Sequence, residues 1–164
     1  MLEGILDYSK IGIKARNPEL TDFNKIIESV KGNLSLLINE HDVKLSYTDL
    51  PTLKADKNQM IQLFQNLISN SIKYRAKEQL MINISAVLKN NTWTFYIKDN
   101  AIGIEEKYFS RIFTIFQRLH TRSEYSGNGI GLAICKKIVE RHSGKISLES
   151  VWGQGSTFII ALPV

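Results

Sequence analysis

The chain has 164 residues, a formal net charge of +5, 43% hydrophobic residues and 23% charged residues. This length suits one domain with an ordinary hydrophobic core, and the composition excludes disordered and fibrous chains. A basic balance favours a polyanionic partner, namely a nucleotide, a nucleic acid or an anionic membrane. The Lys and Arg residues are scattered along the chain, which argues against nucleic acid.

The expected location is the cytoplasm. The single cysteine, Cys135, cannot form an internal disulfide and sits in an apolar helical stretch, so a buried thiol in a reducing compartment is predicted. No stretch is long enough for a membrane span, and the N-terminus lacks the basic start of a signal peptide. We therefore expect no membrane contact by this chain, although a longer parent protein could be attached to a membrane.

The N-terminal segment, residues 1–14, reads as the end of a helix closed by Gly12 and Asn17-Pro18. Its shortness favours the stump of a longer helix, and an ordinary first helix of the domain is the alternative. Residues 23–40 form the next predicted helix, capped by Thr21-Asp22. Its apolar stripe consists of Ile26, Ile27, Val30, Leu34, Leu37 and Ile38.

Two short strands are expected near 43–47 and 52–55, with Pro51 between them. Asp56 then caps a third predicted helix, over 57–75. One side of this helix is apolar, and the other side is polar yet poor in charge, which is unusual for a solvated face. The polar side carries Gln59, Gln62, Asn66, Asn70 and Lys73.

The second half of the chain alternates between strands and one more helix. The expected elements are a hairpin of strands 81–88 and 92–99, an irregular region 100–128, a helix 129–142, and a hairpin of strands 145–150 and 156–162. Ile130, Ile134, Cys135, Ile138, Val139 and His142 should face inward from the last helix. This order predicts a two-layer α/β sandwich.

Two glycine-containing segments are candidate nucleotide contacts. In GNGIGL (127–132), glycines precede a helix whose free N–H groups favour a phosphate, although a flexible hinge explains the pattern equally well. In DNAIGI (99–104), Asp99 ends a predicted strand. A buried carboxylate there can accept hydrogen bonds from the exocyclic amine of adenine, and an ordinary turn aspartate is the alternative.

A third candidate is NLISNSIKY (66–74), where Asn66, Asn70 and Lys73 follow one another by about one helical turn. The oxygen of an Asn side chain is a neutral hard ligand for Mg²⁺, and Lys supplies a point charge for phosphate. A solvated polar face is the alternative. A fourth segment, GQGST (153–157), forms the last predicted turn.

In their joint order, these segments resemble the N, G1, G2 and G3 boxes of the sensor histidine kinase ATPase domain. That domain belongs to the superfamily of gyrase, heat-shock-90, histidine kinase and mismatch-repair ATPases. RIFTIFQRLH, with Phe113 and Phe116, resembles the F box, and FQNLISNSIKYR is similar to phytochrome-like and PAS-linked bacterial kinases. The resemblance covers about residues 20–164 and implies a Bergerat-type sandwich with a mixed, mostly antiparallel sheet packed on helices.

The resemblance assigns roles to individual residues. It implies that Asp99 binds the adenine amine, that Asn70 holds Mg²⁺ with Asn66 in support, and that Lys73 reaches phosphate. Asn66, Asn70 and Lys73 are thereby the expected catalytic residues. The implied ATP-binding set is Asn66, Asn70, Lys73, Tyr74, Asp99, Gly103, Ile104, Phe116, Gly127, Gly129, Gly131, Leu132 and Thr157. Residues 117–128, with Arg118, Arg122, Ser123 and Ser126, are the implied lid.

The implied function is transfer of the γ-phosphoryl group of ATP to a histidine on a dimerisation domain, with a response regulator downstream. LDYSKIG resembles the junction that follows this dimerisation domain, so residues 1–14 would be its end and residues 15–164 the ATP-binding catalytic domain. His41, His120 and His142 do not resemble the acceptor. The chain alone is thus expected to bind ATP as a monomer without autophosphorylation.

Ala101 departs from the pattern, because the resembled G1 box has glycine there. Alanine tolerates positive φ poorly, so a strained loop and weaker nucleotide binding are expected. The alternatives are a degenerate nucleotide-binding scaffold, an anti-sigma-type serine kinase and an ATP-driven clamp. Asn66 argues against the clamp, because the hydrolytic branches place a glutamate base at that position.

Overall fold

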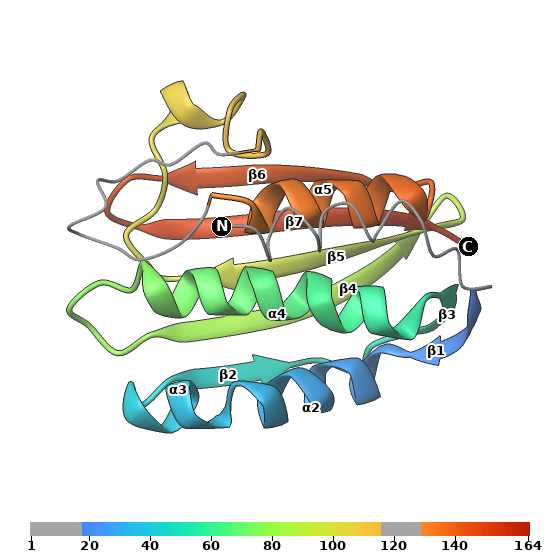
Figure 1. The fold of residues 1–164 in the computed structure, drawn as a ribbon, viewed down its shortest axis with the longest axis horizontal. Helices are drawn as coiled ribbons and strands as arrows, with labels where there is room; N and C mark the ends of the chain where they lie inside the picture. Colours follow the sequence, from blue (N-terminus) through green and yellow to red (C-terminus); the bar gives the residue numbers. More distant parts are fainter. Residues whose placement is uncertain (1–17, 116–128) are drawn as a thin grey trace.

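The computed structural model describes residues 18–115 and 129–164, and in it the main helices cover one face of a sheet (Figure 1). The helices are α2 (Phe23–Asn33), α3 (Ser35–Glu40), α4 (Lys57–Lys73) and α5 (Gly131–Arg141), with a 3₁₀ turn η1 (Glu106–Tyr108). The strands are β1 (Glu19–Asp22), β2 (Lys44–Tyr47), β3 (Thr52–Ala55), β4 (Met81–Lys89), β5 (Thr92–Asp99), β6 (Lys145–Val151) and β7 (Gly155–Pro163).

Five strands form the main sheet in the order β2-β4-β5-β7-β6, and β1 pairs with β3 in a separate two-stranded sheet. Only the β2–β4 pair of the main sheet is parallel, and its other pairs are antiparallel. The predicted two-layer sandwich with a mixed, mostly antiparallel sheet is confirmed. Strand β1 was not predicted, because its last two residues, Thr21-Asp22, carry the signal of a cap for the helix that follows.

The predicted helix over 23–40 is interrupted at Leu34, where φ is −101° and ψ is 9°. The break follows Gly32-Asn33, two weak helix formers in succession. Leu34 itself stays buried, but α3 buries none of its residues and Leu37 is 39% exposed. Of the predicted stripe beyond Leu34, only Ile38 packs against the core, and Leu37 is exposed.

Helix α4 begins as predicted at Asp56. Its Oδ1 accepts hydrogen bonds from the backbone N–H groups of Asn58 (3.0 Å) and Gln59 (3.1 Å), which closes the first turn. The last turn closes through the bond from the Tyr74 N–H to the carbonyl of Asn70 (2.9 Å). The predicted polar helix thus exists at nearly its predicted bounds.

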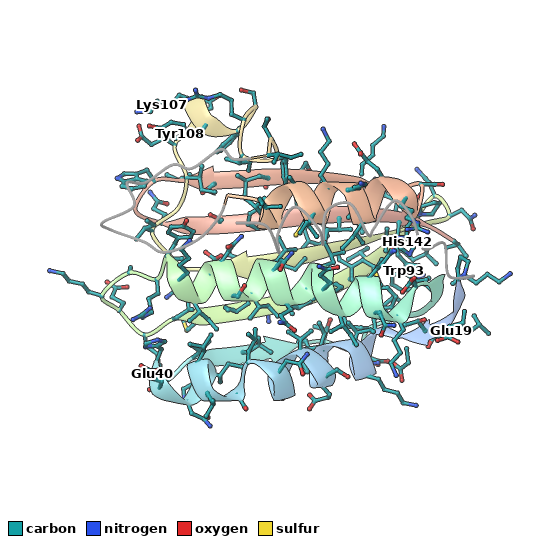
Figure 2. The ribbon with its side chains drawn as sticks, in the orientation of Figure 1. Glu19, Glu40, Trp93, Lys107, Tyr108 and His142 are labelled. Carbon is teal, nitrogen blue, oxygen red and sulfur yellow. The ribbon has the colours of Figure 1, made fainter. Side chains whose placement is uncertain are left out.

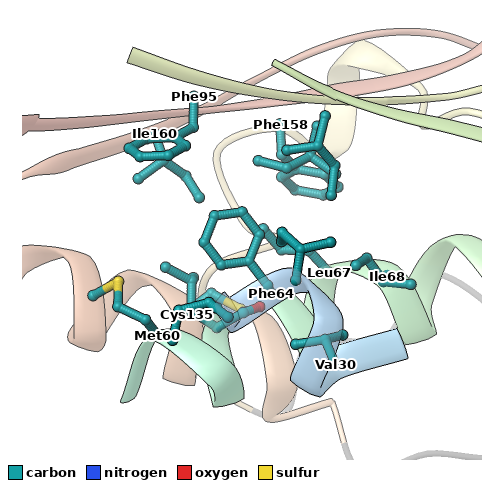
Figure 3. Close-up of a cluster of buried hydrophobic side chains, with 14 of the residues drawn as sticks. Val30, Met60, Phe64, Leu67, Ile68, Phe95, Cys135, Phe158 and Ile160 are labelled. Atoms are coloured by element: carbon teal, nitrogen blue, oxygen red, sulfur yellow. The ribbon is translucent and has the colours of Figure 1, made fainter. Parts of the chain in front are cut away.

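The core lies between the helices and the sheet, as Figure 3 shows for Phe64 of α4 facing Phe95 and Phe158 of the sheet. Phe23, Phe64 and Phe95 form an aromatic cluster with ring centroids 4.8 to 6.0 Å apart. Cys135 is fully buried here, and desolvation raises the pKa of its thiol to about 12. It is therefore the unreactive buried thiol that the sequence predicts.

His142 joins the end of α5 to the start of α4 (Figure 2). Its Nδ1 lies 2.8 Å from the carbonyl of Ile138 and donates to it, while its Nε2 accepts the N–H of Asp56 at 3.0 Å. Both ring nitrogens are thus used within the domain. The inward-facing, structural role expected for His142 is confirmed.

We expect His142→Ala to lower the free energy of unfolding by about 1–3 kcal/mol, because it leaves the part-buried N–H of Asp56 without an acceptor. Urea denaturation measures the difference. His41→Ala, at the end of the partly exposed α3, is the matched control and should change stability by less than about 0.5 kcal/mol. Equal losses in the two variants would contradict this account of the interhelical bond.

Within the two described ranges, no helix is long and apolar enough to cross a membrane. The predicted boundary between residues 14 and 15 lies outside the described residues. The division of the chain into a dimerisation-helix stump and a catalytic domain therefore stays a prediction.

Candidate functional site

Asp99 is the centre of the candidate site. It ends β5, is 6% exposed, and faces the helical layer. Its Oδ1 accepts two backbone N–H groups, from Ala101 at 3.0 Å and from Ser156 at 3.1 Å. Its Oδ2 accepts the hydroxyl of Ser71 at 2.5 Å. A carboxylate has about four acceptor positions, so one position remains, and it belongs to Oδ2.

Burial raises the pKa of the Asp99 carboxyl above its usual value. The three hydrogen bonds, led by the one from Ser71, act in the opposite direction because they stabilise the charged form. A buried acceptor with an open position in a loop-lined site is the feature expected of a base-binding carboxylate.

Hydrogen bonds hold the loop after Asp99 in place on two sides. On one side, the N–H of Ile102 donates to the carbonyl of Tyr74 at the end of α4 (3.0 Å). On the other side, the N–H of Gly153 donates to the carbonyl of Ile102 (2.7 Å), and the N–H of Ile104 donates to Oγ of Ser150 (2.8 Å). The loop therefore lies between α4 and the β6–β7 hairpin. The structure brings the predicted residues Asp99, Ile104 and Tyr74 into one region.

Gly103 allows the close approach of this loop to the hairpin. Its φ is +75°, and a Cβ there would lie 2.2 Å from the carbonyl oxygen of Val151. No residue with a side chain fits without moving the backbone. Gly103 is thus required by local geometry as well as by the resemblance.

Ala101 does not behave as expected. It is not among the described non-glycine residues with positive φ, and it is 4% exposed with its N–H bonded to Asp99. The expected strain at this position is therefore absent. Since the anticipated weakening of nucleotide binding depended on that strain, the structure removes its physical basis.

We accordingly expect Ala101→Gly to give no gain in nucleotide affinity. The variant should lose about 0.5–1 kcal/mol of stability, because glycine gains more conformational freedom on unfolding. Titration calorimetry and urea denaturation measure the two quantities. A gain in affinity of fivefold or more would restore the strained-loop hypothesis.

The polar face of α4 extends from Asp99 towards the start of α5. The Nδ2 of Asn66 donates to the carbonyl of Gly131 at 3.2 Å, which leaves its Oδ1 as an acceptor. The half-buried side chain of Asn70 makes no hydrogen bond to residues 18–115 or 129–164. Both predicted metal-side residues therefore offer an amide oxygen on the same face.

Lys73 and its neighbours line an open cavity of about 490 Å³, whose lining residues are Lys73, Arg75, Ala76, Lys77 and Ile102. The Nζ of Lys73 lies 4.7 Å from the centroid of the Tyr74 ring. Three cationic residues beside Ile102 of the Asp99 loop make this cavity suited to an anion. Lys73 and Tyr74 thus lie together beside the loop that follows Asp99.

Gly129 and Gly131 lie at the entrance to α5. Gly129 has φ +67°, Gly131 is the first residue of the helix, and no side chain caps the first turn. Leu132 is half-buried in that turn. Of the remaining predictions, Phe116, Gly127 and the lid over 117–128 lie outside the described residues.

Thr157 is not brought to the site. It pairs with Lys98 and Glu149, which are both exposed on the sheet face away from the helices. Ser156 lies on the site face instead, opposite Asp99, with 7% exposure. The prediction was wrong by one residue, because successive side chains of a strand point to opposite faces.

Sequence reasoning thus missed Ser156 and Ser71. Strand alternation could have found Ser156, because Phe158 is an evident core residue and Ser156 shares its face. Ser71 had no such signal, since a serine inside a helix more often bonds its own backbone. Only the packing of α4 against β5 reveals its contact with Asp99.

Comparison with known proteins agrees with this geometry. Residues 55–164 match the profile of the family described as "Histidine kinase-, DNA gyrase B-, and HSP90-like ATPase". The chain belongs to that family. It is 46% identical to cyanobacterial phytochrome A of Nostoc sp. over its full length and spans 21% of that protein. The predicted likeness to phytochrome-like proteins is confirmed.

Solved structures of histidine kinases share the fold of this ATPase domain. The catalytic domain of histidine kinase ThkA superposes with a TM-score of 0.76 at 25% identity, over 90% of this chain and 96% of that one. Full-length ShkA in complex with AMPPNP gives a TM-score of 0.82 at 23% identity, over 98% of this chain and 34% of that one. The ThkA likeness covers almost the whole of both chains, so this domain has the same overall fold as that catalytic domain.

Proposed function

We propose that this domain binds ATP with Mg²⁺ and transfers the γ-phosphoryl group to a histidine on a dimerisation domain outside this chain. The observation that carries the proposal is the buried Asp99 carboxylate, which keeps one acceptor position open at Oδ2. The AMPPNP complex of the structurally similar ShkA supports the choice of nucleotide. A response regulator is the expected next acceptor of the phosphoryl group.

The open acceptor position on Oδ2 of Asp99 determines which base would fit the site. Adenine presents an exocyclic amine, which donates a hydrogen bond to Asp99. Guanine presents a carbonyl oxygen there, so two acceptors would face each other without a proton between them. Tyr74 and Ile104, beside the same loop, are the side chains that would line the base.

The phosphate end lies along α4. The oxygens of Asn70 and Asn66 are neutral hard ligands, which fit a Mg²⁺ ion that takes its other ligands from phosphate and water. When bound, Mg²⁺ neutralises phosphate charge. Lys73 adds a positive charge, and the uncapped N–H groups of α5 add donors.

The transfer step needs no general base from this domain. A neutral imidazole attacks the γ-phosphorus through its own lone pair, the bond to the bridging oxygen breaks, and ADP leaves. Asn66 cannot accept a proton from water, which favours transfer over hydrolysis. The roles of this chain are therefore to bind, orient and stabilise charge.

Calorimetric titration with a non-hydrolysable ATP analogue, with and without Mg²⁺, tests the binding half of the proposal. The expected result is binding at micromolar concentrations that weakens when the metal is removed. Absence of binding under both conditions would instead favour a scaffold that holds no nucleotide.

A further inference from the structure

The hydroxyl of Ser71 in α4 contacts the carboxylate of Asp99 at the end of β5. Ser71 is 4% exposed, and its Oγ lies 2.5 Å from Oδ2 of Asp99 and 3.3 Å from the carbonyl of Leu67. A serine hydroxyl has one proton to donate. Because a charged acceptor at short range forms the stronger bond, the proton goes to Asp99.

This bond falls on the one oxygen of Asp99 that keeps an open acceptor position. Oδ1 is occupied by the N–H groups of Ala101 and Ser156. Among the described residues, Ser71 is the one side chain that donates to the carboxylate. The position of the Ser71 hydroxyl therefore determines which lone pair of Oδ2 remains free to accept a hydrogen bond from a ligand.

Resting on the proposed function, we propose that Ser71 is a positioning residue for the nucleotide base. Its hydroxyl orients Oδ2 of Asp99 and holds the carboxylate in the ionised, acceptor-only form that a 6-amino purine requires. Without it, Asp99 keeps its two backbone bonds through Oδ1, but Oδ2 loses its buried donor.

Because Asp99 is buried, loss of the Ser71 hydrogen bond should change how nucleotide binding depends on pH. Burial raises the pKa of Asp99, and the Ser71 bond is the largest influence opposing this rise. The groups that face the carboxylate are Ser71 from α4, Ala101 from the loop and Ser156 from β7. No charged side chain of the described residues contributes to its pKa. Removal of Ser71 should therefore raise this pKa further.

The experiment measures the Kd of a non-hydrolysable ATP analogue from pH 6 to pH 9 for the wild type, Ser71→Ala and Ser71→Cys. Both variants should bind about tenfold more weakly at neutral pH. The loss should grow as pH falls and shrink as pH rises. Titration of the ligand's own phosphates affects every protein equally, so it cancels in the ratio of variant to wild type.

Ser29→Ala is the matched control, because the Ser29 hydroxyl bonds a carbonyl four residues earlier in α2 and lies far from Asp99 in the sequence. Its affinity should equal that of the wild type at every pH. Ser71→Cys replaces the hydroxyl with a thiol of similar size, which is only a weak hydrogen-bond donor. It therefore tests the same prediction if Ser71→Ala does not fold.

Carbon-13 NMR of the Asp99 carboxyl in the nucleotide-free protein gives a second readout. Both Ser71 variants should titrate at higher pH than the wild type. Variants with wild-type affinity and an unshifted carboxyl titration would overturn the role of Ser71 while leaving the proposed function intact. If the wild type itself binds no analogue, the proposed function fails as well.

Discussion

Asp99→Asn should weaken ATP binding by about 100-fold or more while the domain stays folded. The two backbone N–H groups can still bond the remaining amide oxygen. The new amide nitrogen, however, replaces the open acceptor with a donor. It then faces the amine of adenine, which is also a donor. Calorimetry with a non-hydrolysable analogue measures the loss, and wild-type affinity in the variant would show that Asp99 does not bind the base.

The stability of Asp99→Asn provides the matching control. Since burial raises the pKa of Asp99, the folded state holds this proton more tightly than the unfolded state does. The contribution of Asp99 to stability is therefore present at low pH and is lost as pH rises through the folded pKa. Asparagine does not ionise, so at neutral pH the nucleotide-free variant should be at least as stable as the wild type. A large loss of stability would assign Asp99 a mainly structural role.

Gly155→Ala should be the most damaging single change outside the base contact. Gly155 has φ +109°, and a Cβ there would lie 2.1 Å from the backbone oxygen of Asp99. Left-handed strain and overpacking together should lower the free energy of unfolding by about 2–5 kcal/mol. The displaced backbone belongs to Asp99, so nucleotide affinity should fall as well. Urea denaturation and calorimetry measure the two effects.

Substitutions at two other glycines separate the backbone strain expected in Gly155→Ala from its overpacking. Gly153 has φ +81° with no atom within 4 Å of its Cβ position, so Gly153→Ala should lose only about 1–2 kcal/mol for the backbone conformation. Gly32 in α2 has open space and no positive φ, so Gly32→Ala should gain about 0.5–1 kcal/mol. If Gly155→Ala and Gly153→Ala lost equal stability, the steric account at Gly155 would be wrong.

Much of the fold could be predicted because its elements are amphipathic. The α4 and α5 helices and both long hairpins follow the periodicity of their buried residues. The break at Leu34 and the short strand β1 could not be predicted in this way. The break follows Gly32-Asn33 inside a stripe whose periodicity continues across it, and β1 exists only through its pairing with β3.

The structure brings several of the predicted site residues together and places Thr157 elsewhere. Asp99, Gly103 and the polar face of α4 could be found because each has a distinctive residue type at a distinctive position. Thr157 and Ala101 were misjudged for different physical reasons. Side-chain alternation places Ser156 at the site, and the loop containing Ala101 avoids positive φ at that residue. The contact between Ser71 and Asp99 joins residues 28 positions apart and requires the folded structure.

The most direct test of the account is phosphoryl transfer between separate proteins. The domain is incubated with ATP labelled at the γ-phosphate, Mg²⁺ and a separately expressed dimerisation domain that carries the acceptor histidine, with Asp99→Asn as the inactive control. We expect label on the dimerisation domain in an acid-labile, alkali-stable linkage, and none when either protein is omitted. Label that survives acid, or no transfer by a domain that binds the nucleotide, would contradict it.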